Sequence, residues 1–150
     1  MSETRSQFIG EYEDVPLDPK GRLFLPAAFR RALPQGVGSV IVAEWFDGCL
    51  AAFDPDGWEQ VIQQLRGLGL DRGQRDTRQL VRRLVSRAAE VKLDRQGRAL
   101  IPRKLLNLVG ITDRATLAGV IDRVEIWDPA RYIQAQSSVD LEAVAEELDW

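Results

Sequence analysis

Hydrophobic and polar residues follow two periodicities along this chain, and both recur in the same order in its second half. Apolar alternations and short apolar runs are typical of strands and occur at residues 7–17, 23–25, 40–43, 49–53, 91–93, 99–101, 117–121 and 124–127. Apolar residues three and four positions apart are typical of amphipathic helices and occur at 27–33, 58–65, 77–88, 102–109 and 139–148. The pattern therefore predicts an α+β fold in which strand, turn, strand, helix and hairpin occur twice.

Two nine-residue segments in the two halves repeat one another. Asp18-Pro-Lys-Gly-Arg-Leu-Phe-Leu-Pro26 shares its Asp, Gly, Arg and Pro with Asp94-Arg-Gln-Gly-Arg-Ala-Leu-Ile-Pro102, at an offset of 76 residues. Phe53-Asp54-Pro55 corresponds in the same way to Trp127-Asp128-Pro129, at an offset of 74. A unit of about 75 residues is only marginally stable alone. We therefore expect the two units to pair about a pseudo-twofold axis, share one core and place both loops on one face.

Several predicted helices begin with capping signals. Asp54 and Asp128 each precede a proline, which suits the N-cap and the first position of a helix, and Ser137 or Ser138 can cap the last helix. A polar connection at 67–76 precedes the arginine-rich helix at 77–88. That helix is expected to bury a stripe made of Leu80, Val81, Leu84, Val85 and Ala88. The last helix has one apolar face made of Leu141, Val144, Ala145 and Leu148.

The repeated segment has a chemistry that suits a tight loop followed by an exposed cation. The aspartate can accept hydrogen bonds from backbone amides of the turn, and the glycine allows the positive φ that a tight turn often needs. The arginine presents a planar fork of donors that matches phosphate oxygens or the O6 and N7 atoms of guanine. The short Asp-x-x-x-Arg spacing also suits an ion pair that only holds the turn, and chemistry alone favours neither role.

Further polar side chains lie near both loops in the sequence. Lys20 adds a charge at the tip of the first loop, where the second loop has Gln96, which can pair with adenine or a phosphate. Arg30 and Arg103 follow the loops at short range. The candidate DNA-binding residues are Lys20, Arg22, Arg30, Gln96, Arg98 and Arg103, and the candidate loop-shaping residues are Asp18, Gly21, Asp94 and Gly97.

These spaced motifs resemble the MraZ family of bacterial transcriptional regulators, which are built from two AbrB-type swapped-hairpin repeats. The resemblance runs from about Tyr12 to about Tyr132 and is carried by both loop motifs, by Cys49-Leu50 with Trp58-Glu59, and by Val124-Glu-Ile-Trp-Asp128. It implies tandem double-psi-like small β-barrel units with flanking helices. It also implies a ring-forming homo-oligomer that binds short DNA repeats upstream of its own cell-wall and division gene cluster, with Arg22 and Arg98 touching the DNA.

The second unit departs from the family pattern, because Leu105-Leu106 stands where the first unit has Phe29-Arg30. Arg103 or Lys104 would then have to supply the second phosphate contact. The expected organisation is a first AbrB-like DNA-binding repeat at 8–58, a helical connection at 59–88, a second DNA-binding repeat at 89–132, and an acidic C-terminal helix at 133–150.

Composition narrows the classes of function that are open to this chain. It has no histidine and one cysteine, Cys49, so it lacks the commonest general base and cannot form an intrachain disulfide. We expect no enzymatic activity, metal, cofactor or small-molecule substrate, and a buried Cys49.

No segment approaches the roughly 20 apolar residues of a membrane span, and the N-terminus lacks the apolar core of a signal peptide. We therefore expect a cytoplasmic protein associated with the nucleoid. Trp45, Trp58 and Trp127 are expected in core or subunit contacts.

The distribution of charge changes what the net charge suggests. The formal net charge is −3 and the pI is about 5.1, which as bulk values argue against nucleic acid. Yet residues 66–87 contain seven arginines and two aspartates, a net +5, whereas residues 140–150 contain five acids and no base, a net −5. The arginine-rich helix is expected to combine a solvated face with a core stripe.

Two hypotheses of different classes follow from these observations. The leading hypothesis is a sequence-specific DNA-binding regulator, and the rival is a structural module in which the swapped-hairpin core serves assembly only. A positive face around Lys20, Arg22, Arg30 and Arg98 would favour the first.

Overall fold

The computed structural model describes residues 7–69 and 74–150, so residues 1–6 and part of the predicted connection at 67–76 lie outside the described residues. The first half contains β1 (Phe8–Pro16), β2 (Arg22–Phe24), α1 (Ala27–Ala32), β3 (Ser39–Glu44), β4 (Leu50–Phe53), α2 (Pro55–Arg66) and α3 (Arg75–Ser86). The second half contains β5 (Ala89–Lys92), β6 (Arg98–Leu100), α4 (Arg103–Leu108), β7 (Arg114–Ile121), β8 (Val124–Trp127), α5 (Pro129–Ser137) and α6 (Leu141–Glu147). Both halves carry the same succession of elements, as the repeated pattern predicted.

The strands form a six-stranded antiparallel sheet and a separate two-stranded one. The order in the large sheet is β1-β7-β8-β4-β3-β5, which gives equivalent strands when it is followed from either end. The first strand of each half pairs with the third strand of the other half, because β1 pairs with β7 and β5 pairs with β3. The second strands, β2 and β6, pair with each other. The chain therefore has a pseudo-twofold axis that runs between the two halves.

The core is shared by the two halves. One cluster of buried apolar side chains includes Phe8, Leu23 and Phe29 from the first half and Ile101 and Leu106 from the second. The ring of Phe29 meets those of Phe8 and Tyr12 edge-on, with centroids 6.1 and 5.1 Å apart. Because each half contributes strands and core side chains to the other, neither half encloses a core alone. This confirms the shared core that was expected from the small size of each unit.

Local signals in the sequence explain several boundaries. Asp47 and Gly48 both adopt positive φ, at 69° and 88°, where the chain turns from β3 into β4. Helix α2 begins at Pro55 after Asp54, whose Oδ1 accepts a hydrogen bond from the Gly57 amide at 2.6 Å. Helix α5 begins in the same way, since Asp128 Oδ2 accepts from the Arg131 amide at 3.2 Å. These caps confirm the predicted helix starts.

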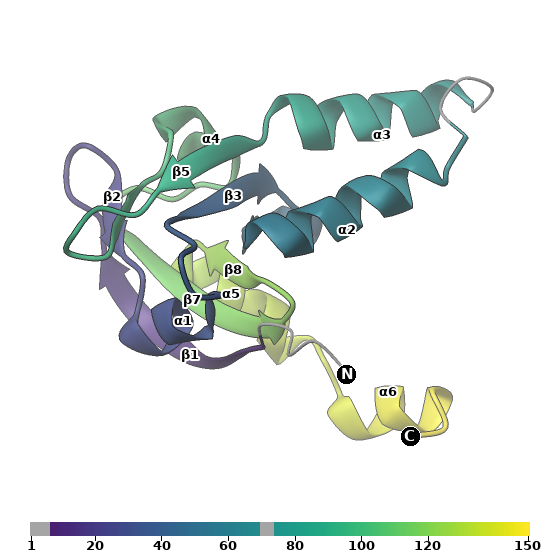
Figure 1. The fold of residues 1–150 in the computed structure, drawn as a ribbon. Helices are drawn as coiled ribbons and strands as arrows, with labels where there is room; N and C mark the ends of the chain where they lie inside the picture. The colour runs from purple at the N-terminus through teal and green to yellow at the C-terminus, as the bar shows by residue number, and fades with distance from the viewer. Residues whose placement is uncertain (1–6, 70–73) are drawn as a thin grey trace.

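The arginine-rich helix differs from its prediction in position and in burial. It spans Arg75–Ser86 rather than 77–88, and Leu84 is its only buried residue. Leu80 and Val85 are 39% and 37% exposed, so the predicted buried stripe is wrong at these positions. The reason is that α2 and α3 form a hairpin that extends away from the sheets (Figure 1), so that little of the chain lies over α3.

The last helix also differs from its prediction. Its N-cap is Asp140, which accepts a hydrogen bond from the Ala143 amide at 3.2 Å, so the serine caps proposed from the sequence are wrong. The hydroxyls of Ser137 and Ser138 instead donate to backbone carbonyls near the end of α5. Helix α6 has no buried residue.

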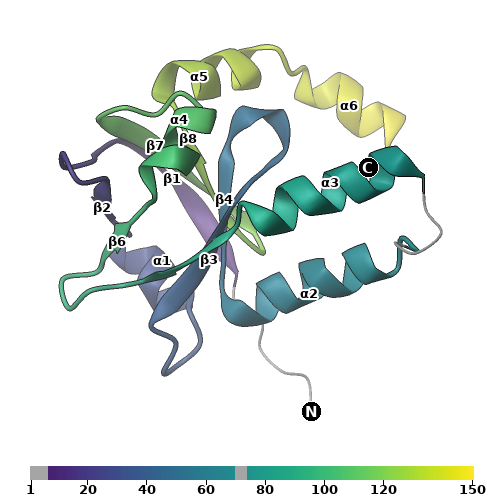
Figure 2. The same cartoon turned by 90° about the horizontal axis from the view of Figure 1, so that it is seen from above.

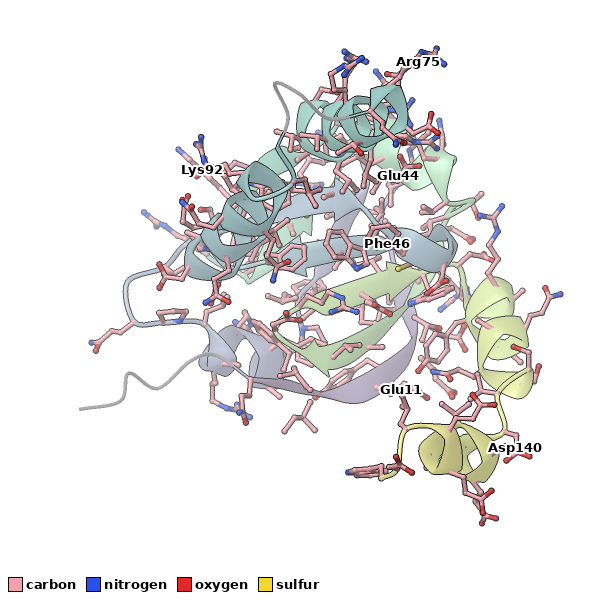
Figure 3. All side chains as sticks on the ribbon, turned by 90° about the vertical axis from the view of Figure 1, so that its right-hand side faces the viewer. Glu11, Glu44, Phe46, Arg75, Lys92 and Asp140 are labelled. Atoms are coloured by element: carbon pink, nitrogen blue, oxygen red, sulfur yellow. The ribbon has the colours of Figure 1, made fainter. Side chains whose placement is uncertain are left out.

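The elements divide the molecule into a loop-bearing side and a helical side. The loops that precede β2 and β6 lie at one end, and the α2–α3 hairpin projects from the opposite end (Figures 1 and 2). Helix α6 lies across the sheet from α3, as Figures 1 and 3 show. Among the described residues no helix has the length and apolar character needed to cross a membrane. The more specific expectations, AbrB-type swapped-hairpin barrels and the four domain boundaries, stay predictions.

Candidate nucleic-acid interface

The first loop, residues 18–22, is organised around one carboxylate. Asp18 Oδ1 accepts hydrogen bonds from the backbone amides of Lys20 and Arg22, both at 3.0 Å. Its Oδ2 accepts from Arg22 Nε at 2.6 Å. Gly21 is buried and has a φ of +90°, a conformation that glycine adopts without strain. The loop therefore holds its arginine through Nε, so the terminal nitrogens of the guanidinium are not engaged by Asp18.

The second loop, residues 94–98, repeats this geometry. Asp94 Oδ1 accepts from the amides of Gln96 and Arg98, both at 2.9 Å, and Oδ2 accepts from Arg98 Nε at 2.7 Å. Gly97 has a φ of +80°. The turn-holding ion pair considered as an alternative is thus present in both loops, and it leaves the ends of both guanidinium forks available for a ligand.

The two loop carboxylates stay charged at neutral pH. The hydrogen bond from the Arg22 amide, followed by the side-chain bond from Arg22, lowers the pKa of Asp18 below its ordinary value. The Arg98 amide and side chain lower the pKa of Asp94 in the same way. Because these pairs neutralise each arginine locally, the net positive charge near the loops depends on the cations around them.

Strands β2 and β6 join the two loops into one antiparallel ribbon. Arg22 pairs with Leu100, Leu23 with Ala99, and Phe24 with Arg98. Leu23 and Ala99 are buried at 1% and 3% exposure, so the alternation of side chains places Arg22, Phe24, Arg98 and Leu100 on the outer surface of the ribbon. We call these four residues the ribbon face. Arg22 and Arg98 are diagonal neighbours on it, about 7–8 Å apart by strand geometry.

Each loop is covered by the helix of the opposite half. Arg30 of α1 donates from Nε to the Leu25 carbonyl at 3.0 Å. Its side chain lies over Gly97, because a Cβ added there would be 2.8 Å from the Arg30 Cδ, Nε and Cζ atoms. The structure therefore brings Arg30 to the second loop, although it follows the first loop in sequence.

The equivalent cover of the first loop comes from α4. Leu106 stands 76 residues after Arg30, and its Cδ1 would be 3.4 Å from a Cβ added to Gly21. Arg103 Nη2 would be 3.8 Å from the same Cβ, and Arg103 Nη1 donates to the Thr112 carbonyl at 3.1 Å. Arg103 thus supplies a cation beside the first loop, where the counterpart of Arg30 is a leucine.

Three residues of this surface were missed in the sequence. Phe24 and Leu100 are 49% and 52% exposed on the ribbon face, at equivalent positions of the repeat. Arg95 is exposed in the second loop, where the first loop has Pro19. The period of two in β2 and β6, together with the aligned repeat, carries the signal that identifies Phe24 and Leu100, because the residues after both loop arginines are all apolar and alternate ones must point outward. Arg95 lies in the loop before β6, where this period gives no signal.

Arg83 of α3 and Arg87, the residue after the helix, both pair with a carboxylate of the sheet. Arg83 donates from Nε and Nη2 to the two carboxylate oxygens of Glu44, at 2.7 and 2.9 Å. Arg87 Nη1 donates to Glu44 Oε1 at 3.0 Å. Hydrogen bonds from Arg83, and then those from Arg87, lower the pKa of Glu44. These two arginines attach the base of α3 to β3.

Cys49, Trp45 and Trp127 gather in a second apolar cluster, which contains no residue of the ribbon face. Cys49 is fully buried, and burial raises the pKa of its thiol to about 12, which confirms its expected burial. Trp127 is buried beside Tyr132, with ring centroids 5.6 Å apart, whereas Trp45 and Trp58 are half-buried against Phe53. In the described part of the chain, no three potential His, Cys, Asp or Glu ligands cluster to suit a metal ion.

Comparisons with known proteins bear on both repeats. A family model described as "MraZ protein, putative antitoxin-like" matches residues 8–82 and again residues 84–149. A protein of Roseiflexus castenholzii named transcriptional regulator MraZ is 43% identical over 136 residues, covering 91% of each chain. Proteins of the same name from Pelotomaculum thermopropionicum and Clostridium beijerinckii are 39% and 38% identical over 144 residues. They cover 94% of both chains in the first case, and 95% of this chain and 96% of the relative in the second.

Proposed function

The chain belongs to the MraZ family, and from this premise we propose that it is a transcriptional regulator that binds short repeated elements in double-stranded DNA. The observation that carries the proposal is the ribbon face, which presents two arginines in equivalent geometry about a pseudo-twofold axis. The major groove of B-DNA admits a two-stranded ribbon. Duplex DNA also has local twofold symmetry, so a pseudo-symmetric ribbon matches a roughly palindromic element.

The residues around the ribbon face divide into two roles in this proposal. Arg22 and Arg98 recognise guanine edges or phosphates with their guanidinium forks. Lys20 and Arg103 beside the first loop, and Arg30 beside the second, contact phosphates that flank the groove. Gln96 contacts adenine or a phosphate. Asp18, Gly21, Asp94 and Gly97 act indirectly, because they hold the two turns.

Phe24 and Leu100 complete the proposed recognition surface. Each is about half exposed and lies opposite the loop arginine of the other repeat. An apolar side chain in the major groove can contact the 5-methyl group of thymine. We therefore assign these residues a preference for thymine next to the base that each arginine recognises.

The proposal includes assembly into a closed ring and location at the nucleoid in the cytoplasm. A pseudo-twofold chain has two unlike sides, so contacts between neighbours are heterologous and close into a ring when the rotation allows. One chain offers two loops on a protein of net charge −3, so its affinity for a single element should be modest. A ring would bind adjacent elements together and gain affinity through effective concentration. In this proposal the elements lie upstream of the chain's own cell-wall and division gene cluster, as the resemblance to the family implies.

The test is a footprint on the DNA upstream of its own gene, followed by titration of duplexes that carry one, two and three copies of the protected element. We expect affinity to increase steeply with copy number and to fall with salt, since phosphate contacts release counterions. Equal affinity for one copy and three would contradict the ring. Absence of protection, with the protein folded and assembled, would favour the rival assembly module.

A further inference from the structure

Helix α6 lacks the packing that a short helix needs. It spans seven residues, Leu141–Glu147, and none of them is buried. Leu141 and Val144 lie on one side of the helix and are 76% and 43% exposed, and Leu148 continues this side at 72%. Helices shorter than about 12–15 residues are marginal in water without tertiary contacts. The apolar side of α6 is therefore a surface that needs a partner.

The charge around this apolar side restricts what the partner can be. Residues 140–150 contain five acids and no base. By helical spacing, Glu142 and Glu147 flank the apolar side on its two edges. A partner for α6 must combine apolar side chains with positive charge.

The α2–α3 hairpin has this combination. Val85 of α3 is 37% exposed and, by helical spacing, lies next to the side that carries Arg82, whereas Leu80, 39% exposed, lies on another side of the helix. Leu68, which follows α2, is 48% exposed. Arg75 and Arg82 are exposed and lie seven residues apart, on the same side of α3. The described residues 66–69 and 74–87 contain six arginines and one aspartate, a net +5, and among these arginines Arg83 and Arg87 share the Glu44 carboxylate.

We propose that α6 of one chain packs against the α2–α3 hairpin of a second copy of the same chain. The inference rests on the assembly part of the proposed function and names its contact surface. Contact within one chain is excluded by the fold, since Arg75 and Asp140 lie at opposite sides of the molecule (Figure 3). Pairing like with like would place acidic α6 against acidic α6, or arginine against arginine, which charge repulsion disfavours.

The pseudo-twofold relation makes this contact repeatable. Helices α5 and α6 follow β8 in the second half just as α2 and α3 follow β4 in the first. Helices α2 and α5 therefore follow equivalent strands on two sides of the shared core, and the helix after each is basic in the first half and acidic in the second. A heterologous contact between the basic and the acidic helix uses each side once per chain and extends into a ring. It leaves the loop-bearing end of every chain free (Figure 1).

Charge reversal in two separate full-length variants tests the contact. One variant carries Glu142→Lys and Glu147→Lys on α6, and the other carries Arg75→Glu and Arg82→Glu on α3. We expect native mass spectrometry to show a multi-subunit particle for the parent chain and mainly monomer for each variant. Mixing the two variants should restore particles that contain them in equal numbers, because the reversed α6 of one then meets the reversed α3 of the other.

Two controls keep the outcome interpretable. Glu13→Lys with Glu90→Lys reverses exposed acids on the sheet strands and should leave assembly unchanged. Leu141→Ser with Leu148→Ser removes apolar contacts without a change of charge and should weaken assembly, while circular dichroism verifies the fold of every variant. A monomeric parent, unchanged assembly in either reversed variant, or no co-assembly on mixing would overturn the inference. Binding to the upstream duplex is measured separately, so its failure would reject the proposed function and not this contact.

Discussion

The two loops of this chain have the same backbone and different surroundings. In each, one aspartate accepts two amides and the Nε of the arginine four residues later, at distances that agree within about 0.1 Å. Their tips differ, because Lys20 corresponds to Gln96. The helix side chains that lie over the loop glycines differ more, because Arg30 lies over Gly97 whereas Leu106 lies over Gly21.

This difference shows which part of the duplicated unit is constrained by folding. The carboxylate, the glycine and the arginine make the turn and are the same in both copies. The exposed side chains at the two tips, Lys20 and Gln96, differ. The side chains on the covering helices also differ, since Arg30 is exposed whereas Leu106 is fully buried in the core. We therefore expect a pseudo-symmetric protein to prefer an element whose two halves are similar but not identical.

The largest effect is expected from removing the arginine that both loops contain. Arg22→Ala and Arg98→Ala should each weaken binding to the upstream element by about 1–3 kcal/mol, and the double variant should lose roughly the sum. Amides of each turn still donate to Asp18 and Asp94, so circular dichroism should be unchanged. Gel-shift titration measures the losses, with Arg131→Ala on α5 as a matched control. An unchanged affinity of the double variant for the upstream element would refute a role for the arginines in DNA binding.

The same glycine substitution in the two loops should have unequal effects. In Gly21→Ala the new Cβ meets the Ile101 carbonyl oxygen at 2.8 Å, a backbone atom that cannot move cheaply. In Gly97→Ala the three atoms nearest the new Cβ, all at 2.8 Å, belong to the Arg30 side chain, which can swing away. Positive φ alone costs a non-glycine residue about 1–2 kcal/mol. Urea unfolding should therefore show a loss of about 1–2 kcal/mol for Gly97→Ala and a larger loss for Gly21→Ala. Equal losses of unfolding free energy would show that the different groups around the two glycines do not affect the cost of the substitution.

A smaller effect concerns the apolar residues of the ribbon face. Replacing thymidine by deoxyuridine in the protected element removes only the 5-methyl group. This change should weaken DNA binding by the parent chain by about 1 kcal/mol, near the lower end of the energy of a specific base contact. It should leave a variant with Phe24→Ala and Leu100→Ala unaffected. If the parent chain binds both duplexes equally, these side chains do not contact thymine methyls.

The smallest effects are expected from pH near neutrality. Asp18, Asp94 and Glu44 have lower pKa values in the folded chain than in the unfolded chain. Their ionised carboxylates therefore stabilise the fold fully at any pH above the unfolded pKa, and this stabilisation is lost as the pH falls through the folded pKa. The chain has no histidine, and the Cys49 thiol titrates at about 12. Unfolding free energy should stay nearly flat between about pH 6 and 9 and fall below about pH 4. A transition near pH 6.5 would contradict this assignment.

Repetition and local capping rules predicted much of this fold from the sequence. The offset of 76 residues aligned the loops, and Asp54 and Asp128 marked helix starts, because these features depend on neighbouring residues. The stripe on α3 was wrong at Leu80 and Val85, since periodicity shows that a helix has an apolar side but not what covers it. The Asp140 cap was missed because Ser137 and Ser138, three and two positions earlier, also offered suitable side chains.

The sequence predicted most residues of the candidate site but not which of them lie together in space. The sequence identified both arginines and both loop carboxylates. It did not show that Arg30 reaches the second loop, because that contact depends on which strands pair across the pseudo-twofold axis. Phe24 and Leu100 were overlooked since apolar strand residues are usually assigned to the core, and their outward direction follows from the pairing of β2 with β6.

The most direct test of the account asks whether both loops of one chain face the same DNA. An iron–EDTA reagent attached to a cysteine at Lys20→Cys, or at Gln96→Cys, cleaves DNA that lies near the loop tip. Cys49 is buried with a thiol pKa of about 12, so the added thiol is the reactive one. We predict two cleavage patches on the upstream element, one from each position, on either side of its centre, and none from Ser137→Cys on α5. Cleavage from only one loop, or from neither, would contradict the paired-loop interface.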